Sequence, residues 1–204
     1  MVSTLSQPDT QTGQSDQPAP VVEMTLEEFL QLPETKPASE FIKGRIYQKT
    51  MPNGEHSTLQ GELTSRINQI GKPNKLVYAL PELRCSFAAR AIVPDISVFT
   101  WERIPRNENG GVANKVTIAP DWIIEILSPE QSVNRVIEKI IFAFEYGTKL
   151  GWLIDPERKR VMIFQDNQMP EIKTGGDSLP VMEVIQDWQL SVADLFSWLY
   201  VDLS

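Results

Sequence analysis

The stretch Pro120-Asp121-Trp122-Ile123-Ile124-Glu125-Ile126-Leu127-Ser128-Pro129 carries the clearest fold signal in this 204-residue chain. Residues 122–127 are almost continuously apolar, a composition typical of a central strand covered on both faces. Ser132 can cap the helix that follows, which we expect to end at Gly147. The single acid in the apolar run, Glu125, marks a candidate functional residue.

Short β-favourable segments lie on both sides of this strand. They are residues 76–80, 83–88, 93–99, 150–154, 160–165 and 171–173. The turn residues 155–158 separate two of them, which predicts a β-hairpin. Residues 41–49 predict a further strand, with a turn allowed at Lys43-Gly44.

Helical patterns alternate with these strands. Thr25 has Glu28 three residues later, as in a capping box, and this predicts a short helix. Residues 56–70 carry an apolar stripe at helical spacing, and residues 192–199 predict a closing helix. The order of elements predicts an α/β (α+β) fold, with a mixed central β-sheet flanked by helices and a C-terminal β-hairpin.

Composition sets the domain organisation that we expect. Residues 1–21 are rich in Ser, Gln, Thr, Pro and Asp, so we expect a disordered tail there and a single domain over residues 22–204. No run of eighteen apolar residues and no basic-then-apolar N-terminal segment occurs, so we expect no membrane span, no secretory signal and a cytoplasmic location. The formal net charge of −8 argues against a protein that coats DNA electrostatically.

Histidine and cysteine are too scarce for several kinds of site. Cys85 and His56 are the only residues of their types, which excludes an intrachain disulfide, a cysteine-rich zinc site and a two-histidine metal site in one chain. Cys85 lies in a predicted strand and is interpreted as a buried, inert thiol. Any metal would be held mainly by oxygen, which favours Mg²⁺ or Mn²⁺.

Asp95 and Glu125 are the candidate metal ligands. Each is an acid in a predicted strand of otherwise apolar or small residues, and a buried carboxylate needs a cation or hydrogen bonds. Two carboxylates that meet across adjacent strands repel unless a metal lies between them. Two alternatives stay open: Asp95 could lie at a strand end in water, and Glu125 could form an ion pair with Lys139 or Arg135.

Four further residues are candidates for supporting roles. Lys139 lies on the shoulder of the helix that follows Glu125 and could reach that acid, or it could be a surface lysine. His56 lies in the apolar stripe of its helix, as a core residue or as a group near the metal. Glu62 lies on the opposite shoulder of the same helix, and Glu82 precedes the predicted strand of residues 83–88.

Blocks spread along the chain resemble the Uma-two family of bacterial endonucleases. They are Val93-Pro94-Asp95-Ile96-Ser97-Val98, residues 120–129, Lys139 with Glu145-Tyr146-Gly147, and Gly151-Trp152-Leu153-Ile154-Asp155-Pro156, preceded by Gly44-Arg45 and the helix of His56. The resemblance covers about residues 24–199. It implies the restriction-endonuclease-like fold, in which an aspartate after proline and a later acid hold Mg²⁺ and a lysine assists the water.

Carried over to this chain, the resemblance implies metal ligation by Asp95 and Glu125 and a catalytic role for Lys139. The usual lysine position holds Leu127, so Lys139 on the next helix takes its place. The family often has an aspartate one helical turn before that lysine, where this chain has Arg135 beside Asn134.

Three readings of function follow. The first is an endonuclease that uses Mg²⁺ (or Mn²⁺) to hydrolyse DNA phosphodiester bonds, with Arg84, Arg90, Arg103 and Arg106 as candidate DNA contacts. The second is a catalytically inactive member of the fold that acts as a binding or assembly module, which the net charge and Arg135 favour. The third is an acidic structural domain whose carboxylates form ion pairs. A homodimer is expected only by analogy with the fold.

Overall fold

A computed structural model describes residues 24–129 and 131–201, so the expected tail over residues 1–21 lies outside the described part. The helices are α1 (Leu26–Gln31), α2 (Gly54–Gly71), α3 (Val133–Glu145) and α4 (Val192–Ser197), with 3-10 turns η1 (Trp101–Arg103) and η2 (Glu183–Ile185). The strands are β1 (Ser39–Ile42), β2 (Arg45–Gln48), β3 (Val77–Pro81), β4 (Cys85–Phe87), β5 (Arg90–Ile92), β6 (Ile96–Thr100), β7 (Trp122–Ile126), β8 (Leu150–Asp155), β9 (Arg160–Gln165) and β10 (Glu171–Thr174). Among these helices, none is both long and apolar enough to cross a bilayer.

The larger sheet has six strands in the order β10-β9-β8-β7-β6-β3. Strands β7 and β8 are parallel, and the other neighbours are antiparallel. Because parallel strands need a crossover, α3 connects β7 to β8. The predicted mixed sheet and the β8–β9 hairpin are therefore confirmed.

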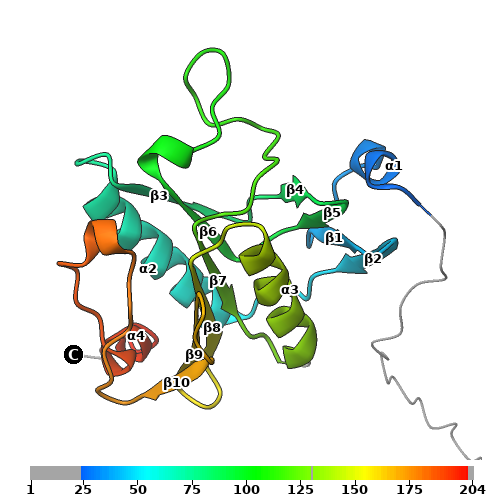
Figure 1. Cartoon of the computed structure of the whole chain (residues 1–204). Helices are drawn as coiled ribbons and strands as arrows, with labels where there is room; N and C mark the ends of the chain where they lie inside the picture. The colour runs from blue at the N-terminus through cyan, green and yellow to red at the C-terminus, as the bar shows by residue number, and fades with distance from the viewer. Residues whose placement is uncertain (1–23, 130, 202–204) are drawn as a thin grey trace, which may run out of the picture.

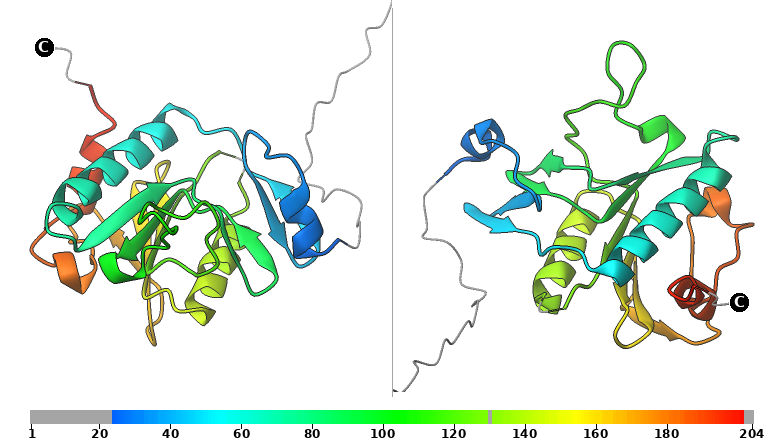
Figure 2. Two further views of the ribbon diagram at one scale, coloured as in Figure 1. Left: turned by 90° about the horizontal axis from the view of Figure 1, so that it is seen from above. Right: turned by 180° about the vertical axis from the view of Figure 1, so that it is seen from behind.

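Helices α2 and α3 cover opposite faces of this sheet (Figures 1 and 2). All five residues of β7 are buried, as its apolar sequence predicts. Ile124 and Ile126 belong to the core beneath α2, and Ile123 belongs to the core beneath α3. Glu125 has the same parity as Ile123, so its side chain is on the α3 side.

The smaller sheet, in the order β2-β1-β5-β4, was not predicted. Residues 41–49 were expected as a strand with a turn allowed at Lys43-Gly44, and the structure has that turn, between β1 and β2 of an antiparallel hairpin. β5 was missed because three residues are too short to show a period-2 pattern. α1 packs beside this sheet through stacking of Phe29 on Phe41.

The predicted strand over residues 93–99 begins later than expected, at Ile96. Asp95 lies in a bend between β5 and β6, after Pro94, which cannot donate a ladder hydrogen bond. The β6–β7 register pairs Ser97 with Ile123 and Ile96 with Ile124. One further step along this register places Asp95 beside Glu125, so the two acids do meet.

The apolar residues of α3 are not buried along its whole length. Val133, the first residue of the helix, is 39% exposed. The buried part of α3 begins at Val136.

Gly71 permits the close approach of α2 to β3, and we predict that Gly71→Ala destabilises the protein. A Cβ at this position would lie 2.5 Å from the backbone oxygen of Val77, which cannot move without distorting β3. Overpacking of this kind costs about 1–3 kcal/mol in the free energy of unfolding, measured by urea denaturation.

The matched control for this substitution is Gly61→Ala in the same helix. A Cβ at Gly61 meets no heavy atom within 4 Å, so alanine should raise the stability by about 0.5–1 kcal/mol. Equal effects of the two substitutions would contradict the packing argument.

Cys85 is fully buried, and we predict that its thiol does not react in the native protein. Burial raises the pKa of the Cys85 thiol to about 12, so the reactive thiolate is scarce at pH 8. Ellman's reagent should label Cys85 only in guanidinium chloride. Ser57→Cys, at an exposed position on α2, should add one thiol that reacts at once, and native labelling of Cys85 at that same rate would refute the prediction.

Candidate functional site

Asp95 is held by three groups from different parts of the fold. Its carboxylate is 2% exposed. Oδ2 accepts a hydrogen bond from the backbone N–H of Ile126 at 2.7 Å and lies 3.2 Å from His56 Nε2. Oδ1 lies 2.6 Å from Lys49 Nζ. Asp95 therefore joins α2, β7 and the segment after β2.

Glu125 lies at the centre of the larger sheet and is 1% exposed. Oε2 accepts a hydrogen bond from Lys139 Nζ at 2.9 Å. Oε1 is buried and has no hydrogen-bond partner within the described part of the chain. One oxygen of this carboxylate is therefore oriented by the protein, and the other has the capacity to bind a ligand.

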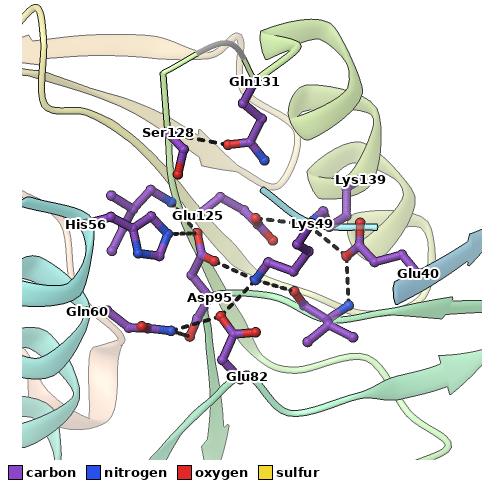
Figure 3. A network of polar contacts seen from close by, with 12 residues as sticks. Glu40, Lys49, His56, Gln60, Glu82, Asp95, Glu125, Ser128, Gln131 and Lys139 are labelled. Atoms are coloured by element: carbon purple, nitrogen blue, oxygen red, sulfur yellow. Dashed lines mark hydrogen bonds and ion pairs between the residues drawn. The ribbon is translucent and has the colours of Figure 1, made fainter. Parts of the chain in front are cut away.

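Lys139 is buried rather than exposed, with a side chain that is 2% accessible. Its ammonium also lies 2.9 Å from Glu40 Oε1, and that oxygen accepts a hydrogen bond from the backbone N–H of Val93 at 2.8 Å. Glu40 thus ties β1 and α3 to the segment that carries Asp95. Figure 3 shows Lys139 between Glu125 and Glu40.

Lys49, His56, Gln60 and Glu82 surround Asp95 on its other side (Figure 3). Lys49 Nζ contacts Glu82 Oε1 at 2.9 Å and the Val93 carbonyl oxygen at 3.0 Å, besides Asp95. Gln60 Nε2 donates to Glu82 and to the Asp95 carbonyl oxygen. His56 lies in the first turn of α2. Asn53 caps this helix, because its side chain accepts a hydrogen bond from the backbone N–H of His56.

Sequence analysis missed two members of this cluster, Glu40 and Lys49. Glu40 did carry a signal, because it is an acid in the buried strand Ser39–Ile42, as Glu125 is in β7. Lys49 follows an exposed strand end and looks like any surface lysine. The other predicted residues, His56, Glu82, Asp95, Glu125 and Lys139, do come together.

Glu62 and four arginines lie elsewhere. Glu62 pairs with Arg66 on the exposed side of α2. Each candidate DNA contact has another partner: Arg84 contacts Glu34, Arg90 lies over Phe142, Arg103 pairs with Asp121, and Arg106 donates to the Trp101 carbonyl oxygen. Arg135 lies over the Tyr47 ring. None of the four candidate arginines lines the cavity that opens onto Asp95.

The electrostatics of the two central acids differ. Burial alone would raise the pKa of Asp95, but the His56 hydrogen bond and the Lys49 charge hold it well below its usual value. Burial raises the pKa of Glu125 to about 8, against the opposing charge of Lys139. Burial opposes the charge on Lys139, but Glu125 and Glu40 raise its pKa above the ordinary lysine value. The cluster therefore favours an additional positive charge near Glu125.

The residues present fit a hard divalent cation held by few protein ligands. No three His, Cys, Asp or Glu residues form a ready metal cage in the part of the chain that the structure describes. However, Mg²⁺ commonly takes one or two carboxylates and completes its shell with water and substrate phosphate. Glu125 Oε1 is a buried acceptor with no hydrogen-bond partner among the described residues, and Asp95 lies close enough for its charge to raise the pKa of Glu125.

A cavity of about 390 Å³ opens onto one side of this cluster. Lys49, His56, Gln60, Glu82 and Asp95 are among its lining residues. Glu125 and Lys139 are not among them, and Lys139 instead lines two smaller cavities of about 220 and 50 Å³.

Comparisons with known proteins identify the family to which the chain belongs. The model of the family Uma2, described as putative restriction endonuclease, matches residues 26–193. A search of curated proteins found no match. A crystal structure from Anabaena variabilis, described as a putative nuclease belonging to DUF820, is 50% identical with a TM-score of 0.85. The match covers 87% of this chain and 99% of that chain. The chain therefore belongs to the Uma2 family, the family that its sequence motifs resemble.

Proposed function

We propose that this protein is a metal-dependent endonuclease that hydrolyses DNA phosphodiester bonds at the Asp95–Glu125 pair. The observation that carries the proposal is the second oxygen of Glu125, which is buried and unpartnered beside an ionised Asp95. The family description and the name of the Anabaena protein both point to nuclease chemistry. DNA is the substrate class that a restriction endonuclease cleaves.

Asp95 and Glu125 would hold the cation, with Mg²⁺ or Mn²⁺ preferred because both donors are oxygen. When bound, such a cation supplies charge for a phosphate oxygen and lowers the pKa of a water. The protein positions the donors: His56 and the Ile126 N–H fix Asp95, and Lys139 fixes Glu125.

Access to the pair is from the cavity beside Asp95. A phosphate group there would meet the side chains of Lys49 and His56 among the lining residues. The net charge of −8 then matters less than the charge at the cavity, since a nuclease needs only a local positive region.

The alternative is an inactive member of the fold that serves as a binding or assembly module. Leu127 stands where the superfamily has its lysine, and Lys139 lies behind Glu125 without lining the cavity. The absence of Mn²⁺ binding at millimolar metal would favour this module over the enzyme.

The proposed function predicts that Asp95→Asn abolishes nicking of supercoiled plasmid in Mg²⁺ or Mn²⁺. Glu125→Gln should do the same, because each change removes a charged donor. The loss should exceed the roughly 10–100-fold that removal of a supporting residue costs at metal sites. EDTA should stop cleavage by the unaltered protein.

Asp166→Asn is the control for this experiment, because it makes the same chemical change at an exposed residue after β9. It should cleave at the rate of the unaltered protein. Equal cleavage by the Asp95→Asn and Asp166→Asn proteins would refute the assignment of the site.

The position of Lys139 predicts a large loss of stability in Lys139→Met. The substitution leaves Glu125 and Glu40 buried without their shared cation, and breaking a buried pair costs about 3–5 kcal/mol. Lys173→Met is the control, since Lys173 pairs with a mostly exposed Glu171 and its loss should cost about 1 kcal/mol at most. Urea denaturation at neutral pH measures both, and equal losses would contradict the structural role of Lys139.

A further inference from the structure

The ammonium of Lys49 is surrounded by oxygen atoms of the kinds that bind a divalent cation. Its ammonium lies 2.6 Å from Asp95 Oδ1, 2.9 Å from Glu82 Oε1 and 3.0 Å from the Val93 carbonyl oxygen. Two carboxylates and one backbone carbonyl are the oxygen ligands that Mg²⁺ and Mn²⁺ take in proteins. The side chain is 9% accessible, so these contacts are largely shielded from water.

Asp95 has little remaining capacity for a metal while Lys49 is in place. Oδ2 already receives the Ile126 N–H and faces His56. Oδ1 is therefore the oxygen that remains for a cation, and Lys49 holds it. The Glu125 carboxylate, with its unpartnered Oε1, lies in the same cluster as Asp95 and Lys49 (Figure 3).

A cation bound between Asp95 and Glu125 would thus share Asp95 Oδ1 with an ammonium group. A divalent and a monovalent charge on one oxygen repel each other strongly in a buried site. The lysine can relieve the repulsion, because it is a compact charge on a flexible four-carbon stem. The cavity next to Lys49 gives it room to move.

We propose that Lys49 is a built-in competitor for the divalent cation, which holds Asp95 and Glu82 in the metal-free protein and leaves Asp95 when the metal binds. This inference rests on the proposed function, because it concerns the same metal site. In that position the ammonium of Lys49 balances part of the negative charge of Asp95 and Glu82. It also means that the protein lowers its own metal affinity.

The test is a Mn²⁺ titration of the full chain by isothermal calorimetry, with Lys49→Met beside the unaltered protein. The substitution removes the competing charge and keeps an unbranched side chain that is one atom shorter. Lys49→Met should bind Mn²⁺ at least about tenfold more tightly, a difference of about 1.4 kcal/mol. Unchanged or weaker Mn²⁺ binding by a folded Lys49→Met would overturn the proposal.

Lys36→Met is the matched control. Lys36 lines the same cavity, so its loss removes the same charge near the site without touching Asp95. Its Mn²⁺ affinity should stay within about twofold of the unaltered protein, since exposed charges are screened. A tenfold gain with Lys36→Met as well would mean that general charge, and not Lys49 in particular, sets the affinity, and would overturn the proposal.

A second measurement uses the unaltered protein, so it does not depend on whether the variant folds. Lysines are acetylated with and without Mn²⁺, and the modification is read by mass spectrometry. Mn²⁺ should speed acetylation of Lys49 and leave Lys36 unchanged. Slower or unchanged acetylation of Lys49 at saturating Mn²⁺ would show that the metal binds without displacing the ammonium, and would overturn the proposal.

These outcomes separate the inference from the proposed function. If the unaltered protein binds Mn²⁺ and cleaves plasmid but Lys49→Met gains no affinity, only the inference fails. If Lys49→Met binds Mn²⁺ more tightly while no protein cleaves plasmid, the nuclease proposal fails and the competition stands. If neither protein binds Mn²⁺, both fail.

Discussion

The structure depends on the burial of Glu125 in the middle of a strand that is covered on both faces. A carboxylate there loses its hydration, and this cost has to be met by cations or hydrogen bonds nearby. α3 follows β7 in the chain and packs on the face of the sheet where the side chain of Glu125 lies, so Lys139 can donate a hydrogen bond to Glu125. The crossover through α3 makes β7 and β8 parallel. One connection therefore sets the direction of β8 and also brings the positive charge of Lys139 to Glu125.

The smaller sheet supplies the rest of the charge balance. β1 brings Glu40 to the other side of Lys139, and the residue after β2 brings Lys49 to Asp95. Four carboxylates and two ammonium groups thus gather where the sheets meet, and most of them are buried. Buried ion pairs stabilise a fold poorly unless each member is satisfied. Within the described residues Oε1 of Glu125 has no hydrogen-bond partner, and the proposed cation would satisfy it.

Much of the fold and part of the site could be predicted from local patterns. The apolar run of β7, the β8–β9 hairpin and the apolar stripe of α2 have clear signals in the sequence, and the structure confirms them. The Asp95–Glu125 pair was predicted because both acids interrupt apolar segments. The smaller sheet and the late start of β6 were not predicted, because short strands have no distinctive period. For Lys139 the sequence left a surface position and a contact with Glu125 both open, and the structure shows the contact.

The sequence by itself determined that any metal here would be held mainly by oxygen, since one histidine and one cysteine cannot supply most of the ligands of a site. The sequence also identified Asp95 and Glu125 as candidate site residues, because a carboxylate among apolar residues is recognisable without knowing where its strand lies in the fold. Only the tertiary structure decided which cations face them. Lys49 lies 46 residues from Asp95 along the chain, and Glu40 lies 99 residues from Lys139. Contacts between such distant segments depend on how two sheets pack, and no local pattern records that packing.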